Sequence, residues 1–195
     1  MNIGITGNIG SGKTTVCKIF ESMGIPIYYA DEEAKRLMED DLNVKEQIKL
    51  VFGMSAYAED GSLDRKYLGS IVFNNPKMLN KLNYIVHPAV KRHSLAWSKK
   101  QKNAAYTIKE AALLIESGNY TALDKIIVVT APLALRIARV MKRDATDEAE
   151  VMAREDKQLP EKEKVALADH IIINDGEHSL VEQVQKVHKS IIGSI

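Results

Sequence analysis

A glycine-rich stretch close to the N-terminus has residue types and spacing that suit the binding of a polyphosphate. Residues 7–14 read GNIGSGKT, in which a glycine, four residues and then Gly-Lys-Thr follow the pattern of a phosphate-binding loop. The glycines let backbone N–H groups converge on phosphate oxygens, and a helix after the loop adds its positive N-terminal end. We expect Lys13 to contact the β- and γ-phosphates and the Thr14 hydroxyl to ligate Mg²⁺.

The loop pattern by itself does not distinguish ATP from GTP, or water from another phosphate acceptor. A GTPase would also need a base-reading segment of the Asn-Lys-x-Asp kind, and the sequence lacks one. The apolar run DKIIVVTA ends without the acid that holds magnesium in many ATPases. Both absences favour a kinase for a small molecule. The alternative to nucleotide binding is a turn that only joins a strand to a helix.

Asp31 is the candidate for a catalytic base. It follows the apolar run IPIYYA, a predicted strand, and is therefore expected at the carboxyl edge of a sheet, where open α/β folds bind ligands. We expect this strand to lie next to the loop strand, which would aim the carboxylate at the terminal phosphate. There it could accept a proton from an acceptor hydroxyl. The alternative role for Asp31 is the N-cap of the helix that starts in DEEAKRLM.

Several arginines recur on one side of a predicted helix. Arg136, Arg139 and Arg143 are three and four residues apart, and Arg154 follows in a polar, charged stretch. Guanidinium groups offer a rigid pair of donors that suits phosphate oxygens. We interpret the four as a phosphate clamp beside a lid that excludes water from the reaction. A solvated basic face is the alternative.

The elements that must position these residues alternate between strand and helix at the start of the chain. Apolar runs at 1–6 and 25–30 predict buried strands, and helical patterns follow at 13–23 and 31–40. A β-α-β-α opening of this kind indicates a parallel sheet.

The strand signal then disappears over residues 41–101, which show helical patterns. Pro88 lies inside the last of these patterns and is expected to kink or end the helix. We predict that a helical substrate-binding insertion occupies about residues 32–101 of a single domain that spans residues 1–195.

Strand signals return at 105–111, 124–131 and 170–174. The charged stretch before the last of them has helical propensity but little apolar face, which predicts a lid at about residues 144–168. Ser179 with Glu182 forms a capping box for a closing helix.

Composition restricts the class of protein. The chain has 195 residues, 45% of them hydrophobic and 27% charged, which is enough to bury the core of one globular domain. Lys and Arg number 27 against 26 Asp and Glu, so no excess positive charge favours nucleic acid. The single cysteine, Cys17, fits core packing in a reducing compartment. With no leader-like start and no run of about 20 apolar residues, we expect a soluble cytoplasmic protein without a membrane span.

Several motifs, in the same order along nearly the whole chain, resemble those of the dephospho-coenzyme A kinase family. They are GITGNIGSGKTTV, GIPIYYAD, LNYIVHP, ALLIESGNY, RVMKRD, Arg154 with Gln158, and ALADHIIIND with Gly176. The phosphate loop occurs in many families, whereas the His-Pro pair, the Leu-Leu-x-Glu segment and the Ala-Asp-x-x-Ile-x-Asn ending are specific. The resemblance implies a P-loop kinase fold with a five-stranded parallel sheet, a helical substrate domain and a lid. It also implies transfer of the ATP γ-phosphate to the ribose 3′-hydroxyl of dephospho-coenzyme A, the last step of coenzyme A synthesis.

The resemblance implies roles for the residues at matching positions. The implied catalytic residues are Asp31, Lys13 and Arg139. The implied ATP contacts are Gly7, Asn8, Ile9, Gly10, Ser11, Gly12, Lys13, Thr14, Thr15, Arg143 and Asn174. The implied acceptor contacts are Asp31, Lys35, Arg36, His87, Pro88, Glu116, Arg139 and Arg154. From the residues alone, His87 beside Pro88 also fits a helix kink, and Asn174 also fits a turn after a strand.

The sequence departs from the family pattern at several positions. Tyr29 stands where an Asp often precedes Ala-Asp, Lys35 replaces an Arg, Ala112 replaces a Pro and Arg136 replaces a Gln. Lys35 keeps the charge but lacks the bidentate fork, so either Arg36 supplies that phosphate contact or the contact is weaker.

Two other functions stay open at this stage. A different P-loop kinase would act on a nucleoside monophosphate or a small sugar-like alcohol, whereas a coenzyme A precursor needs a long groove with cationic groups. Lys35, Arg36, Lys91 and Arg92 are available for such a groove. A regulatory module would bind ATP without transferring phosphate. The sequence is compatible with a monomer or an oligomer.

Overall fold

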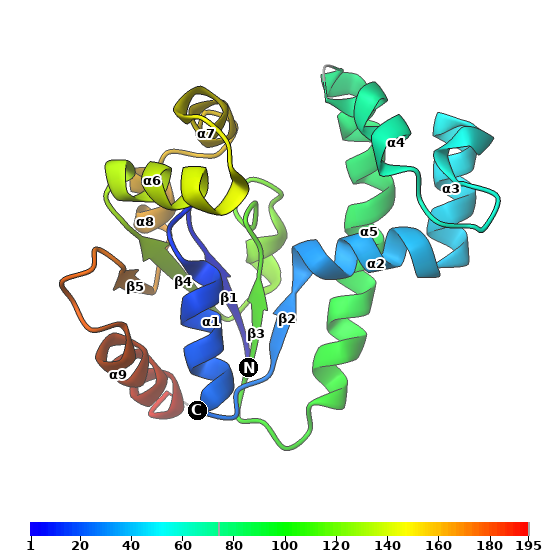
Figure 1. Cartoon of the computed structure of the whole chain (residues 1–195). Helices are drawn as coiled ribbons and strands as arrows, with labels where there is room; N and C mark the ends of the chain where they lie inside the picture. The colour runs from blue at the N-terminus through cyan, green and yellow to red at the C-terminus, as the bar shows by residue number, and fades with distance from the viewer. Residues whose placement is uncertain (74, 195) are drawn as a thin grey trace. The chain divides into compact units, whose positions relative to one another are not determined.

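The computed structural model describes residues 1–73 and 75–194. Over these residues the chain divides into two compact units, one made of Met1–Tyr29 with Ser98–Ile195 and the other of Ala30–Trp97. Figure 1 shows a sheet with surrounding helices in the first unit and helices in the second.

The described strands form one parallel sheet in the first unit. The order across the sheet is β2-β3-β1-β4-β5, and every neighbouring pair is parallel. The strands are β1 (Asn2–Thr6), β2 (Ile27–Tyr29), β3 (Thr107–Glu110), β4 (Lys125–Thr130) and β5 (His170–Ile173). The predicted α/β class with a five-stranded parallel sheet is therefore confirmed over the described residues.

The strand that precedes Asp31 is not the neighbour of the loop strand. Ile108 in β3 pairs with Ile3 of β1 on one side and with Ile27 of β2 on the other. Our expectation that Asp31 follows a strand adjacent to β1 is therefore wrong. The connection from β1 to β2 leaves one position of the sheet open between these two strands. Strand β3, which follows the helical unit in the sequence, occupies that position.

Two helices build the main core with the sheet. They are α1 (Lys13–Ser22) and α9 (Leu180–Ile192), and Ser179 caps α9 by accepting a hydrogen bond from the Glu182 backbone N–H, as predicted. Their buried side chains pack with those of the strands; from these helices they are Val16, Cys17, Phe20, Val184, Val187 and Ile191. Cys17 is fully buried and is therefore a core residue, as expected, and this burial raises the pKa of its thiol.

Three further helices of the first unit follow β4. They are α6 (Leu133–Asp144), α7 (Glu148–Glu155) and α8 (Glu161–Ala166), and α7 and α8 lie within the predicted lid. In Figure 1, α6 and α7 lie near the carboxyl end of β1. A short 3-10 helix, Asn119–Ala122, precedes β4.

The second unit is helical. Its elements are α2 (Ala30–Asp40), α3 (Leu42–Phe52), a 3-10 helix (Met54–Ala56), α4 (Arg65–Val72) and α5 (Pro76–Lys100), the last few residues of α5 belonging to the first unit. Asp41 and Asp64 cap α3 and α4 by accepting backbone N–H groups of the first turn. Helix α5 continues through Pro88, so this proline does not end the helix.

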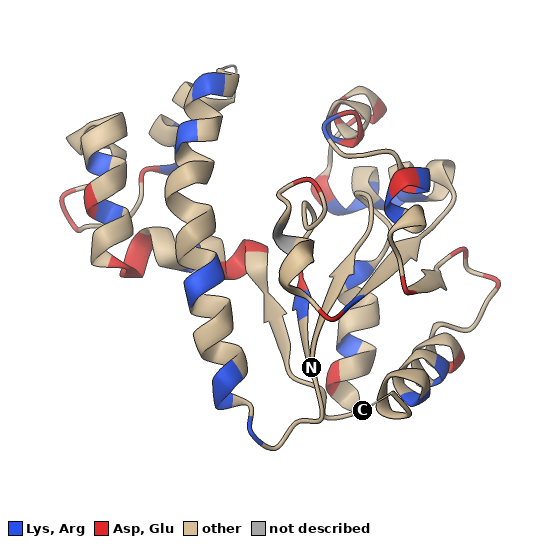
Figure 2. Cartoon of the chain, turned by 180° about the vertical axis from the view of Figure 1, so that it is seen from behind, with Lys and Arg blue, Asp and Glu red and all other residues tan. Residues whose placement is uncertain are grey.

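Charged residues of both signs are spread over both units. Figure 2 shows Lys and Arg interspersed with Asp and Glu along the helices, in keeping with the near-zero net charge of +1. Within the described residues, the length and apolar character that a membrane-crossing helix needs are not combined in any helix.

Candidate active site

The stretch GNIGSGKT forms the connection between β1 and α1. Strand β1 ends at Thr6 and α1 begins at Lys13, as the loop pattern requires. Gly10 and Gly12 adopt positive φ angles of 77° and 94°. A Cβ atom at Gly10 would lie 2.4 Å from the backbone oxygen of Arg136. The loop therefore needs glycine at this position for its conformation and for its close contact with α6.

Side chains hold the backbone of this loop from within the first unit. The Lys13 ammonium donates a hydrogen bond to the Gly7 carbonyl oxygen at 2.8 Å. The Asn174 side-chain amide donates to the Ser11 carbonyl oxygen at 2.7 Å. Asn174 follows β5, is buried and would clash with any side chain at Gly12, since its Nδ2 is 2.0 Å from the position of a Cβ there. Asn174 thus lies against the phosphate-binding loop rather than in an isolated turn.

An acid that the sequence did not single out ends the strand next to the loop strand. Glu110, the last residue of β3, is buried and pairs in register with Ile5 of β1. Its charge helps to raise the pKa of the Cys17 thiol, although desolvation of the thiol is the larger cause. Polar and apolar residues alternate in AYTIKEA, and this pattern does not show whether an acid at the end of the strand is buried or exposed.

Arg136 is buried and does not lie on an exposed basic face. Its Nε donates to the Ala131 carbonyl oxygen at 3.0 Å, and its Nη1 donates to the Ile9 carbonyl oxygen at 3.3 Å. Its two terminal nitrogens bind both carboxylate oxygens of Glu155, at 2.6 and 2.9 Å. The guanidinium group thus contacts the loop itself, and the alternative of a solvated basic face does not apply to Arg136.

The other three arginines of the predicted clamp have different partners. Arg139 donates to the backbone and side-chain oxygens of Asn174, at 3.1 and 3.2 Å. Arg143 and Arg154 both bind Asp144, at 2.7 and 2.8 Å. Hydrogen bonds from Arg143, with a further contribution from Arg154, lower the pKa of Asp144 to about 2. Arg139 therefore lies beside the loop-supporting Asn174, while Arg143 and Arg154 meet at the junction of α6 and α7.

The end of α7 is tied directly to the phosphate-binding loop. The Asn8 side-chain amide donates to Glu155 Oε1 at 2.8 Å and to the Leu159 carbonyl oxygen at 3.3 Å. The Gln158 side-chain oxygen accepts the Ile9 N–H at 2.7 Å. Burial of Glu155 opposes its ionisation, but hydrogen bonds from Arg136 and Asn8 outweigh that cost and lower the pKa of this carboxyl. Part of the predicted lid is thus in contact with the loop.

Glu116 lies close to the same region and is held by a buried lysine. Its Oε1 is 2.8 Å from the ammonium of Lys164 and accepts the Leu159 N–H at 3.0 Å. Lys164 is fully buried, which the surrounding sequence PEKEK, rich in exposed charges, did not suggest. In this arrangement Glu116 anchors the segment between α7 and α8, and its predicted contact with the acceptor stays a prediction.

Replacing Lys164 with methionine is expected to lower the free energy of unfolding by about 3 kcal/mol, because the change leaves the Glu116 carboxylate buried without its cation. Lys162→Met, at an exposed position of the same helix, is the matched control and should leave stability nearly unchanged. Urea denaturation followed by circular dichroism measures both. Equal stability of the two variants would show that the pair contributes nothing to the fold.

The remaining predicted acceptor residues lie in the second unit. Asp31 is exposed in the first turn of α2, within the helix rather than at the residue before it. Lys35 is exposed on the same helix. Arg36 donates to Glu33 at 2.7 Å and lies 3.3 Å from a ring nitrogen of His93. The Arg36 fork thus engages an acid and a histidine of its own unit, and whether Lys35 or Arg36 contacts a phosphate stays open.

His87 and Pro88 lie within α5, where His87 is half-buried and Pro88 is exposed. Their predicted contact with the acceptor stays a prediction. Helix α5 continues past both residues to Lys100, so the pair does not mark a helix boundary. A bend of α5 at this pair stays a prediction.

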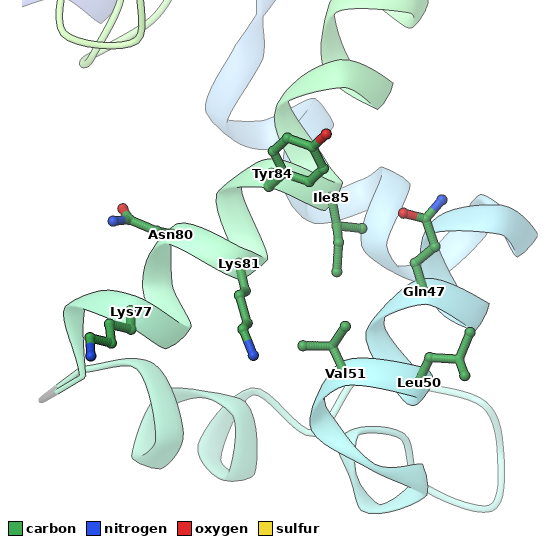
Figure 3. Close-up of a pocket in the computed structure, with 8 residues that line it drawn as sticks. All are labelled: Gln47, Leu50, Val51, Lys77, Asn80, Lys81, Tyr84 and Ile85. Atoms are coloured by element: carbon green, nitrogen blue, oxygen red, sulfur yellow. The ribbon is translucent and has the colours of Figure 1, made fainter.

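The second unit also contains a groove that the sequence did not predict. It lies between α3 and α5 with a volume of about 520 Å³. Figure 3 shows apolar and polar side chains around it, and they are Gln47, Leu50, Val51, Lys77, Asn80, Lys81, Tyr84 and Ile85. The cations proposed for an acceptor groove, Lys35, Arg36, Lys91 and Arg92, are not among them. This groove is therefore distinct from the cationic groove predicted from the sequence.

The residues present fit a magnesium ion held mainly by a bound nucleotide. Magnesium usually keeps several waters and takes one or two protein ligands together with substrate phosphates. Thr14 is exposed in the first turn of α1, directly after the loop, where its hydroxyl can take that role. In the described part of the chain, groups of three or more His, Cys, Asp or Glu that could hold a metal by themselves do not occur.

Comparison with known proteins gives one consistent family. A sequence profile described as dephospho-CoA kinase matches residues 1–179. A dephospho-CoA kinase from Salinibacter ruber is 43% identical over 176 residues, which cover 89% of this chain and 88% of that protein.

Two solved structures resemble the fold over almost its full length. The dephospho-CoA kinase from Campylobacter jejuni is 31% identical and superposes with a TM-score of 0.72, covering 99% of this chain and 98% of the other. A protein from Thermus thermophilus is 37% identical with a TM-score of 0.86, covering 97% and 96%.

Proposed function

This chain belongs to the dephospho-CoA kinase family, and on that basis we propose that it transfers the γ-phosphoryl group of ATP to the ribose 3′-hydroxyl of dephospho-coenzyme A. The family carries out the final step of coenzyme A biosynthesis. The observation that supports the proposal most strongly is a fully formed phosphate-binding loop within a chain that matches this family over residues 1–179.

The loop supplies the electrostatic part of the reaction. Its glycines allow the backbone conformation in which N–H groups can converge on the triphosphate, and the N-terminus of α1 adds positive potential. Lys13 is the first residue of α1, at the end of the phosphate-binding loop. When ATP binds, its ammonium can exchange the Gly7 carbonyl oxygen for oxygens of the β- and γ-phosphates. Magnesium, held by the phosphates and Thr14, would neutralise charge that develops on the phosphoryl oxygens. These groups stabilise the transferring phosphoryl group and the ADP that leaves.

Asp31 is the proposed base for the acceptor. The 3′-hydroxyl oxygen forms a bond to the γ-phosphorus, the bond between that phosphorus and the bridging oxygen of ADP breaks, and ADP leaves with the electron pair. The hydroxyl proton passes to the Asp31 carboxylate. Asp31 is an exposed residue in the first turn of α2, two residues after the end of β2. The acceptor contacts proposed for Lys35, His87, Pro88 and Glu116 belong to this proposal.

The lid segment has a supporting role in excluding water. Water competes with the intended acceptor, and a kinase must therefore align the acceptor in a site from which water is excluded. Arg139, in α6 before this segment, and Arg154, in α7, are the proposed cations for the acceptor, and Arg143 is the proposed contact to ATP. The contacts of Asn8 and Ile9 with the end of α7 bring this segment against the loop, in agreement with such a role. A cytoplasmic location stays a prediction from the sequence.

A panel of acceptors tests the proposal. We expect kcat/KM for dephospho-coenzyme A to exceed that for AMP, gluconate or shikimate by at least about 10²-fold, since a site built for one acceptor leaves polar groups unpaired with another. ADP release in a coupled assay measures the rates, and phosphorus NMR of the product identifies the 3′-phosphate. The Lys13→Ala protein, purified in the same way, controls for contaminating kinases. Faster turnover of any other acceptor, or tight ATP binding without any transfer, would contradict the proposal.

A further inference from the structure

Side chains hold Ile9 of the loop through both of its backbone groups. The Ile9 carbonyl oxygen accepts a hydrogen bond from Arg136, and the Ile9 N–H donates to Gln158. In a planar trans peptide the carbonyl oxygen and the following N–H point in opposite directions. Because the Ile9 carbonyl oxygen faces the Arg136 guanidinium, the Gly10 N–H of the same peptide points away from that guanidinium.

Packing adds to this constraint. Gly10 lies so close to α6 that a Cβ atom would come within 2.9 Å of the Cα of Arg136 as well as 2.4 Å of its backbone oxygen. The backbone of Arg136 thus packs against Gly10, while its guanidinium donates a hydrogen bond to the Ile9 carbonyl oxygen. One residue of α6 fixes both the place and the orientation of the loop tip.

Glu155 keeps the Arg136 guanidinium in this position. The carboxylate binds Nη1 and Nη2 of Arg136 in a bidentate pair, and the two side chains are 5% and 15% exposed. It also accepts a hydrogen bond from Asn8, the residue before Ile9 in the loop. Glu161 comes within 3.9 Å of Arg136 Nε as a more distant acid. A bidentate pair at this burial restricts the guanidinium to one orientation.

We propose that Arg136, held by Glu155, is a positioning residue for ATP, which directs the Gly10 N–H toward the triphosphate through its hydrogen bond to the Ile9 carbonyl oxygen. This inference rests on ATP binding by the loop, as in the proposed function. Neither side chain needs to contact the nucleotide. Their effect is to keep a backbone donor in the orientation that a phosphate oxygen requires, so that binding does not have to order it.

The test replaces Glu155 with glutamine, which keeps the shape of the side chain and removes its charge. We expect the Kd and the KM for ATP to rise about tenfold, because the guanidinium loses its charge-assisted bidentate partner. We expect kcat at saturating ATP and the KM for dephospho-coenzyme A to change by less than about threefold, since the reacting groups are untouched. Glu148→Gln, an exposed position on the same helix, is the matched control and should resemble the unaltered protein.

A merely structural role gives a different result. Loss of folded protein lowers kcat per total enzyme and the melting temperature but leaves the KM for ATP at its original value. An unchanged ATP Kd in a folded Glu155→Gln protein would overturn the proposal. Should that variant fail to fold, Arg136→Lys decides instead, because lysine keeps the buried charge but has no fork, and the same rise in ATP Kd is required of it. Calorimetric titration with ATP alone gives the Kd even if dephospho-coenzyme A proves not to be the acceptor.

Discussion

Replacing Asp31 with asparagine is expected to lower kcat by at least about 10²-fold while the KM for ATP stays nearly unchanged. The amide has almost the shape of the carboxylate but cannot accept the hydroxyl proton of the acceptor. Asp31 lies in the first turn of α2, after β2 and apart in sequence from the loop, so the change should leave the loop contacts intact. Steady-state kinetics with ATP and dephospho-coenzyme A, each varied in turn, measures the effect.

Two further variants make the Asp31 result specific. Glu32→Gln removes the neighbouring exposed carboxylate from the same helical turn and should leave kcat nearly unchanged. Glu110→Gln probes the buried acid at the end of β3, the strand that separates β2 from β1. If Asp31→Asn retained full turnover while Glu110→Gln lost it, the base would be Glu110 and our assignment of Asp31 would be wrong.

The features that the sequence predicted well are those fixed by neighbours along the chain. Residues 7–14 predicted the loop between β1 and α1, because its conformation depends on glycines within the loop and on the helix directly after it. The apolar runs likewise predicted β1 and β4, since burial of parallel strands on both faces requires near-continuous apolar side chains. Caps such as Ser179 depend on contacts three residues away and were equally readable.

The features that the sequence did not predict depend on contacts between distant segments. The order of the strands is the first such feature, because the residues of β1 and β2 do not indicate that β3 lies between these two strands in the sheet. Arg136 is another, because helical spacing places it beside Arg139 and Arg143 but does not reveal Glu155, nineteen residues later, as its partner. Lys164 is a third, since its partner Glu116 lies far away in the sequence, before a 3-10 helix, β4, α6 and α7. Charge patterns thus predicted which residues are polar but not which polar residues are buried in pairs.

Replacing Lys13 with alanine is expected to impair both ATP binding and turnover, in contrast to the change at Asp31. The ammonium meets the phosphates before and during transfer, so its loss should raise the KM for ATP by about tenfold or more and lower kcat by about 10²- to 10³-fold. The Lys13 ammonium also donates a hydrogen bond to the Gly7 carbonyl oxygen at 2.8 Å, so a small loss of loop order is expected as well. Calorimetric titration with ATP and a coupled kinetic assay separate the two effects.

The control for Lys13 is a second lysine of α1 that faces solvent. Lys18→Ala removes the same charge from the same helix at an exposed position and should leave ATP binding and kcat nearly unchanged. A melting curve of each variant identifies any change that arises from unfolding. If Lys13→Ala bound ATP and turned over as well as Lys18→Ala, the loop would not be holding the triphosphate. Because the roles proposed for Asp31 and for Arg136 both require a phosphoryl group placed by this loop, that result would remove the basis for both.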